Sequence, residues 1–480
     1  MHKLRLLDLY SYSYTRGVYK LHLPPGFEFL PEALKYLRWH FYPSTSLPSR
    51  FSSENLVELH MRNSRLEQLW NKGVQINLES LKLIDLSHSE HLADVSPLIE
   101  SPNLKSIALQ GCTSLVRLPS SFQNLAKLTS LNLFGCSNLK ILPEMPSNLK
   151  VLLLDKTAIE ELPSSIWSLE KLYYLTLSRC EELKSLPSST CRLNSLPNLH
   201  GCGSLESLPV ELPSGLKGLE LSDCESLGSL RVELPSGLEY LDLRNCKSLG
   251  SLPVELPSGL KGLYLSGCMS LGSLPVELPS GLKGLYLSGC MSLGSLSVEL
   301  PSGLKGLSAL YLSGCESLGS LPIELPSGLD YLDLRNCKSL ESLPVELPSG
   351  LEYLHLRNCK SLGSLPVELP SGLQSLKLRN CKSLGSLPKL PWLLALFDAE
   401  GCTSLETVSS SMRTAPTQGR DQLRDEDLSF LNCVKLDQSA RSNIMADAQL
   451  RVMRMQLHHV SSIKPVRLIL SVREMKFQSG

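Results

Sequence analysis

The chain repeats one pattern of apolar and polar positions along most of its length. The shared pattern is LxxLxLxxCxSLxSLPxELPSG, and the copy that begins at Leu216 follows it except at Arg231. Inside this pattern the LxL core alternates, so both leucines point to one face, as a short half-buried strand requires. The remainder is rich in Pro, Ser and Gly, and proline cannot extend a sheet ladder. Each copy therefore predicts one strand followed by a return segment.

The cysteines mark the period of the array. They fall every 22 residues from Cys202 to Cys290 and again from Cys315 to Cys381, with one 25-residue step between the runs. Counting LxL cores from Leu7 to Phe397 gives 18 units, followed by a degenerate one that ends at Cys433. Because a single copy cannot bury its own apolar face, we expect the copies to stack into an α/β solenoid, a horseshoe with a concave parallel sheet.

Two segments depart from the period. Around Cys202 the strand leucine is replaced by Pro197, which predicts a kink or a poorly paired strand. We expect the solenoid to occupy residues 1–408, a polar linker 409–427, a degenerate repeat with a short helix 428–456, and an irregular tail 457–480. The helix is indicated by four apolar residues spaced four apart, and it either caps the exposed core or docks a partner. These residues are Ala440, Ile444, Ala448 and Val452.

Charge and targeting signals narrow the function. The chain carries 47 basic and 47 acidic residues, which argues against a general nucleic-acid or anionic-membrane binder. It has no apolar stretch long enough to span a bilayer and no apolar core of a signal peptide at its start. Its 15 cysteines recur once per repeat rather than in clusters, and no Asn-x-Ser/Thr site occurs. We therefore expect a reducing compartment, the cytoplasm, with the nucleus left open.

The cysteine column is interpreted as structural. Ser64, Ser89 and Thr157 occupy the same repeat position, so a small polar group is expected to bond to backbone there. No CxxC pair exists, and we expect no metal and no cofactor. HExxH and GxSxG motifs are also absent, which predicts a non-catalytic protein. The expected structural thiols are Cys224, Cys246, Cys268, Cys290, Cys337, Cys359 and Cys381.

These repeats resemble the leucine-rich-repeat region of plant disease resistance proteins of the Toll/interleukin-receptor, nucleotide-binding class. The segment LPEALKYLRWHFYPSTSLPSRFSSENLVELHMRNSRLEQLW, residues 30–70, is similar to that family's first repeats. The segment LSFLNCVKLDQSARSNI, residues 428–444, is similar to the region after them. The resemblance implies an intracellular innate-immunity module that senses a pathogen effector or a host protein and contacts a nucleotide-binding domain. No GxxxxGK[ST] occurs, so the resemblance implies a truncated receptor.

Two alternatives stay open at this point. Near-identical copies, such as those around Cys268 and Cys290, give a monotonous surface, which favours a bare scaffold or pseudogene product without a ligand. The text LPSGLKGL also resembles bacterial leucine-rich-repeat ubiquitin ligases. Their catalytic cysteine belongs to a large carboxy-terminal domain, whereas fewer than 80 residues follow Cys402 and no Cys-x-Asp occurs.

Candidate binding residues follow from aligning the outward strand positions of successive copies. Neighbouring strands lie about 4.8 Å apart, so equivalent residues form columns. Two interpretations remain: a solvated charge ladder copied by duplication, or a surface that meets an acidic partner beside an aromatic area. The residues predicted to bind under the second are Tyr264, Tyr286, Tyr311, Asp333, Arg335, His355, Arg357, Lys377 and Arg379.

Overall fold

The computed structural model divides the chain into two compact units, Met1–Pro235 and Ser236–Gly480. The residues it describes are 4–9, 27, 29–71, 73–74, 76–186, 198–209, 211–296, 304, 306–410, 427–457 and 467–470. Most of the expected linker, Pro197 and most of the tail lie outside these residues.

The first unit is a stack of short parallel strands. An 8-stranded sheet runs in chain order, so each strand pairs with the next copy along the sequence. Its strands are β1 (Leu6–Leu9), β2 (Tyr36–Trp39), β3 (Glu58–His60), β4 (Leu83–Asp85), β5 (Ser106–Ala108), β6 (Ser130–Asn132), β7 (Val151–Leu153) and β8 (Tyr174–Thr176). Strand β9 (Gly218–Glu220) belongs to the same unit. Three return segments form 3-10 helices, which bury Leu98, Phe122 and Ile166: η1 (Ser96–Glu100), η2 (Ser120–Asn124) and η3 (Ser164–Ser168).

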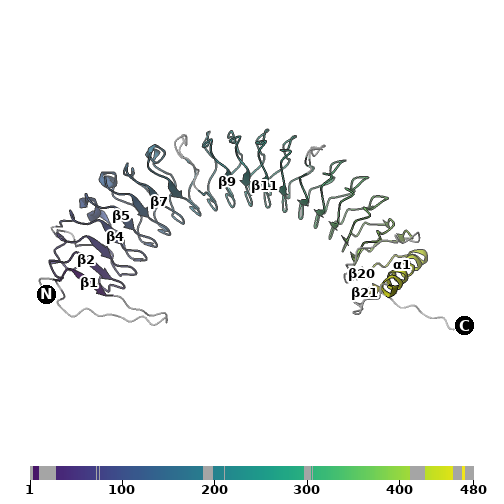
Figure 1. Ribbon diagram of the computed structural model, residues 1–480, viewed down its shortest axis with the longest axis horizontal. Coiled ribbons are helices and arrows are strands. Elements are labelled where there is room, and N and C mark those ends of the chain that lie inside the picture. Colours follow the sequence, from purple (N-terminus) through teal and green to yellow (C-terminus); the bar gives the residue numbers. More distant parts are fainter. Residues whose placement is uncertain are drawn as a thin grey trace. The chain divides into compact units, whose positions relative to one another are not determined.

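The second unit repeats this construction with shorter return segments. Its strands also pair in parallel and in chain order (Figure 1). They are β10 (Tyr240–Asp242), β11 (Gly262–Tyr264), β12 (Gly284–Tyr286), β13 (Ala309–Tyr311), β14 (Tyr331–Asp333), β15 (Tyr353–His355), β16 (Ser375–Lys377), β18 (Leu396–Asp398), β20 (Asp427–Phe430) and β21 (Arg467–Leu470). On the return side β17 (Ser386–Leu387) pairs with β19 (Thr407–Val408). Helix α1 (Gln438–Leu457) follows β20.

The predicted parallel solenoid is confirmed. Strands β1 to β16 and β18 coincide with 17 of the 18 expected cores. The remaining core contains Pro197, and both this residue and the kink expected there lie outside the described residues. At the centre of the strands Leu332, Leu354 and Leu376 are in register and fully buried. The alternation of the LxL core therefore places one continuous leucine core behind each sheet.

A left-handed residue turns the chain immediately before each cysteine of the later copies. Asn336, Asn358 and Asn380 have φ values of 62°, 64° and 62° there, a conformation that asparagine tolerates better than most residues. The Nδ2 group of Asn358 donates to Oδ1 of Asn336 at 2.7 Å, and Asn380 donates likewise to Asn358 at 3.0 Å. The RNC sequence thus repeats because it fits this turn and links neighbouring copies.

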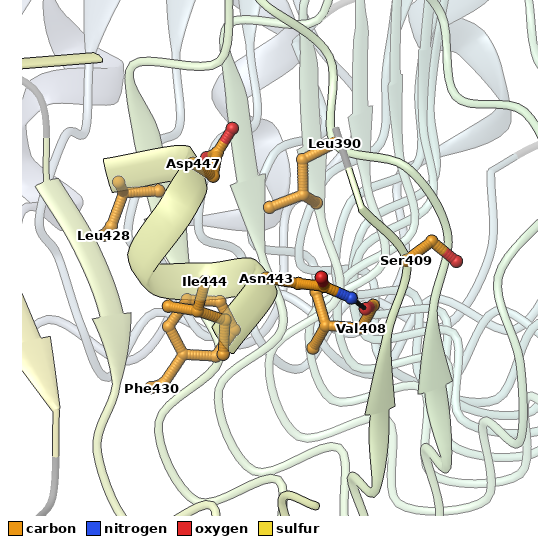
Figure 2. Close-up of a pocket in the computed structure, with 8 residues that line it drawn as sticks. All are labelled: Leu390, Val408, Ser409, Leu428, Phe430, Asn443, Ile444 and Asp447. Carbon is orange, nitrogen blue, oxygen red and sulfur yellow. Dashed lines mark hydrogen bonds between the residues drawn. The ribbon is translucent and has the colours of Figure 1, made fainter. Parts of the chain in front are cut away.

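Helix α1 packs on the last copies of the second unit. Ala440, Ile444 and Ala448 are buried, as the four-residue spacing predicts, while the side chain of Val452 lies outside the described residues. Figure 2 shows Ile444 and Asn443 of α1 lining a pocket together with Val408 and Phe430. Asn443 Nδ2 donates to the Val408 carbonyl oxygen at 2.8 Å. These contacts support the capping interpretation of the helix.

A buried arginine fastens α1 to the return side. Arg451 is 1% exposed, and its Nε donates to Asp447 Oδ2 at 2.8 Å. Its Nη1 and Nη2 donate to the carbonyl oxygens of Leu394 at 2.5 Å and Pro391 at 3.4 Å. Burying a guanidinium is costly unless it is paired and hydrogen-bonded, and this one is both.

Candidate functional site

The outward side chains of β10 to β16 and β18, together with those of the second residue after each of these strands, are called the strand face here, and they include a ladder of stacked tyrosines. The rings of Tyr264 and Tyr286 lie 4.8 Å apart, and those of Tyr286 and Tyr311 lie 5.1 Å apart. In each pair the planes of the two rings are tilted by only 8° relative to each other. The stacking follows from the register, because β11, β12 and β13 align these three residues directly. Each ring therefore restricts the motion of its neighbour.

Glycines make room for the two first rings. A Cβ on Gly262 would lie 3.0 Å from Cε2 of Tyr264, and one on Gly284 would lie 2.8 Å from Cε2 of Tyr286. Each ring thus lies across the backbone of the residue two positions earlier in its own strand. The GLYL sequence of these copies is the local signal for this arrangement.

The aromatic run extends beyond the three predicted tyrosines. At one end the Arg244 guanidinium carbon lies 5.8 Å from the Tyr264 ring centre. At the other end the ring centre of Tyr331 lies 5.4 Å from that of Tyr311 and 6.0 Å from that of Tyr353. The sequence columns missed Tyr331 and Tyr353 because these residues occupy the first strand position, where β11, β12, β13 and β16 carry Gly, Ala or Ser.

The three arginines among the predicted binding residues are paired with carboxylates rather than left as free positive charges. Arg335 Nη2 lies 2.7 Å from Oδ2 of Asp333, which is 1% exposed. Arg357 Nη2 reaches Asp398 Oδ2 at 2.8 Å, and Arg379 Nη2 reaches Glu400 Oε1 at 2.6 Å. Asp398 and Glu400 belong to the β18 copy, which the sequence columns did not include. The surface is therefore less basic than the sequence suggested.

Lys377 and His355 lie side by side on β16 and β15. Burial lowers the pKa of His355 to about 4, and the Lys377 ammonium adds to this shift. Burial also lowers the pKa of Lys377, with further contributions from the Arg357 and Arg335 guanidinium groups. His355 is thus neutral near pH 7, and its Nδ1 lies 3.2 Å from the Tyr331 hydroxyl. All nine residues predicted to bind a partner lie on this face, and their role in binding stays a prediction.

The predicted structural cysteines lie in the interior of the coil. All seven are buried, and none forms a disulfide. In six of them Sγ donates to a carbonyl oxygen of the preceding copy at 3.0–3.3 Å: Cys224, Cys268, Cys290, Cys337, Cys359 and Cys381. In earlier copies the hydroxyl of Thr157 donates to a backbone carbonyl, and those of Ser64 and Ser89 bond to each other.

We expect these thiols to resist modification in the native chain. Burial raises the pKa of Cys224 and of Cys268 to about 12, so their reactive thiolate forms are scarce at neutral pH. Iodoacetamide at pH 7.5, followed by peptide mass spectrometry, should label Cys224, Cys268 and Cys359 only after denaturant is added. Rapid labelling of these residues in the folded protein would contradict a structural role.

The described residues include neither a candidate metal site nor a candidate membrane-spanning helix. They contain no group of three His, Cys, Asp or Glu side chains placed to hold a metal ion. In the same part of the chain, no helix has the length and apolarity that a bilayer crossing demands.

Comparison with known proteins identifies the repeats. The family described as Leucine Rich Repeat matches residues 55–75 and again residues 237–258. Both segments are leucine-rich repeats. The leucine-rich repeats of this chain are homologous to those of plant disease resistance proteins, as the resemblance predicted. Disease resistance protein RPP2A of Arabidopsis thaliana is 45% identical over 155 residues, which cover 32% of this chain and 12% of that protein.

Other relatives match a similar share of this chain. Disease resistance protein RPS6 of Arabidopsis thaliana is 38% identical over 33% of this chain and 16% of its own length. Disease resistance protein RRS1 of the same plant is 40% identical over 33% of this chain and 11% of its own length. The leucine-rich-repeat chain thus spans only a small fraction of these relatives.

Solved structures show a more distant likeness. YopM from Yersinia enterocolitica WA-314 has a TM-score of 0.36 and 27% identity, over 79% of this chain and 85% of that one. The Leptospira interrogans leucine-rich-repeat protein LIC12759 has a TM-score of 0.39 and 22% identity, over 73% of this chain and 91% of that one. Because these scores are low, the functions of those proteins say nothing about the present chain.

Proposed function

We propose that this chain is a non-catalytic recognition and regulatory module of an intracellular plant immune receptor. It binds a protein, either a pathogen effector or a host protein, and so contributes to effector sensing and the defence response. In an intact receptor it also contacts the nucleotide-binding domain. Homology of its repeats to those of disease resistance proteins supports the receptor context. The buried cysteines, none of which is bridged, support a reducing compartment, the cytoplasm or nucleus.

The observation that carries the binding proposal is the tyrosine ladder on the strand face. Tyrosine supplies a large contact area and loses little conformational entropy on binding, and residues of this type dominate many protein interfaces. Here stacking on both sides holds Tyr286 before any partner arrives. Such preorganisation reduces the entropic cost of association. The ion pairs of Arg335, Arg357 and Arg379 lie next to the aromatic run and favour partners of matching charge pattern.

The experiment is capture of proteins from infected leaf extract by the full chain and by a variant. Replacing Tyr264, Tyr286 and Tyr311 with threonine removes the rings and puts β-branched residues, which also favour strands, in their place. We expect the captured partner to bind at least about 100-fold more weakly, because three aromatic anchors that each contribute on the order of 1–2 kcal/mol together contribute about 3–6 kcal/mol.

The matched control replaces Tyr173 and Tyr174 with threonine. These two tyrosines are 71% and 52% exposed and lie in the first unit. This variant should capture the same partner as the native chain. Circular dichroism and thermal unfolding check that both variants fold. Equal capture by the ladder variant would contradict the proposal, and a folded native chain that captures nothing would favour a bare scaffold.

A further inference from the structure

One basic side chain of the strand face has no counterion. At β14, β15, β16 and β18 this face carries four basic and three acidic side chains, namely Asp333, Arg335, Arg357, Lys377, Arg379, Asp398 and Glu400. Six of them form three ion pairs, and Lys377 is left over. Within the described part of the chain no carboxylate forms an ion pair with its ammonium group. This part of the strand face therefore carries one positive charge in excess.

The neighbours of Lys377 in the sheet do not neutralise it. Lys377 lies in register between His355 on β15 and Asp398 on β18, and His355 is neutral near pH 7. Both carboxylate oxygens of Asp398 are engaged, because Oδ2 accepts from Nη2 of Arg357 and Oδ1 accepts from the backbone N–H of Glu400. To reach Asp398 the side chain of Arg357 crosses β16, which separates the two strands. A second cation is thus brought close to the Lys377 ammonium group.

The protonated form of Lys377 is disfavoured in these surroundings. Burial lowers the pKa of Lys377, and the guanidinium groups of Arg357 and Arg335 lower it further. The carboxylates of Asp398 and Asp333 act in the opposite direction and do not cancel the effect. A partly buried charge is costly unless an opposite charge neutralises it. An anion that binds at Lys377 would remove this cost.

Two further donors on the same strands lack acceptors. Ser375 lies two residues before Lys377 on β16, is only 1% exposed, and its hydroxyl group has no hydrogen-bond partner. The Nε group of Arg357 is shielded from solvent and has no partner either. Because buried polar groups are nearly always hydrogen-bonded, an acceptor is what this place lacks. Since both donors are shielded, the partly exposed side chain of Lys377 is the group that a ligand reaches first.

We propose that Lys377 binds a carboxylate group, the side chain of an aspartate or glutamate of the partner protein. This inference rests on the proposed function, because it concerns the same strand face. The site lies at the end of the aromatic run: Nδ1 of the neighbouring His355 is 3.2 Å from the Tyr331 hydroxyl, and Ser375 is in register with Tyr353. A partner that covers these rings would therefore place its acidic residue beside them.

A carboxylate fits the charge and the hydrogen bonding of the site better than other anions. It carries one negative charge, which equals the excess on this part of the strand face, and its oxygens accept from the donors present. A phosphorylated side chain would bring close to two negative charges and leave one of them without a partner. A nucleic acid would bring a row of phosphates against the three carboxylates of this face.

The first experiment uses the full chain without a partner. Lysines are labelled at pH 8 with a succinimidyl ester, and peptide mass spectrometry gives the labelling rate of Lys377 and of Lys382, an exposed lysine of the same copy. Only the neutral amine reacts, and a bound anion favours the protonated form. Acetate should therefore slow labelling of Lys377 at least about threefold relative to chloride at equal ionic strength, and leave Lys382 unchanged. Inorganic phosphate should protect Lys377 less than acetate does.

Equal labelling of Lys377 in acetate and chloride would overturn the proposal. Equal protection of Lys377 and Lys382 would do the same, because it would indicate a general salt effect. Protection by phosphate alone would also overturn it and would identify a phosphorylated side chain as the occupant.

The second experiment uses the captured partner. Lys377→Met removes the charge and should weaken binding about tenfold, whereas Lys377→Arg should retain most of it. The matched control is Lys382→Met, which should bind like the native chain. Circular dichroism checks that the variants fold.

The two proposals fail in different ways. If the variant with Tyr264, Tyr286 and Tyr311 replaced by threonine loses the partner while Lys377→Met binds like the native chain, the carboxylate site is refuted and the proposed function stands. If the native chain captures no partner, the proposed function fails. The labelling rates in acetate then still decide whether Lys377 binds a carboxylate.

Discussion

Replacing Arg451 with methionine should lower the free energy of unfolding of the second unit by about 3–5 kcal/mol. The substitution leaves the carboxylate of Asp447 in a site that is 8% exposed. It also removes the donors to the carbonyl oxygens of Leu394 and Pro391. Urea unfolding followed by circular dichroism measures the change.

The matched control is Arg441→Met on the same helix, which is exposed and should change stability by less than about 0.5 kcal/mol. A second variant that also replaces Asp447 with leucine should recover most of the loss, because the buried carboxylate is then removed together with the guanidinium. If Arg451→Met were as stable as Arg441→Met, α1 would not be a cap held by this arginine.

Leu354→Ala should destabilise the second unit by about 2–5 kcal/mol. Leu354 is fully buried at the centre of β15 and lies in register between Leu332 and Leu376. Since each copy of a solenoid contacts only its neighbours, a cavity at Leu354 weakens the interfaces with both of them. Urea unfolding again gives the magnitude.

Leu396→Ala removes the same atoms from the first position of β18, where the side chain is 40% exposed. Its cost should be about 1 kcal/mol or less. Equal losses at the two leucines would mean that the LxL core is not the buried layer of the coil.

The strands and the buried core could be predicted from the sequence because each depends on local alternation. In the LxL core the side-chain period of two fixes which leucines face inward, and the stacking of copies then follows. The prediction that Ala440, Ile444 and Ala448 share the buried face of a helix also rested on spacing alone and agrees with their burial.

The pairings on the strand face could not be predicted this way. Arg357 pairs with Asp398, which is 41 residues away and two strands further along the sheet, so a column of identical positions misses it. The burial of Arg451 could not be predicted either. Its guanidinium group is stable there because it donates to the carbonyl oxygens of Leu394 and Pro391, which a distant copy supplies. In both cases a long side chain reaches from one copy to another. The repeat period does not specify which copy it reaches.

Binding through the strand face is tested most directly by photo-crosslinking from the ladder. A benzophenone-bearing phenylalanine derivative in place of Tyr286 puts the reactive group in the stack, and the same derivative in place of Tyr173 puts it on an exposed site of the first unit. With infected leaf extract and ultraviolet light, the chain modified at position 286 should form a covalent adduct with its captured protein, and the one modified at 173 should not. An adduct from 173 alone, or capture without any adduct from 286, would contradict recognition through the tyrosine ladder.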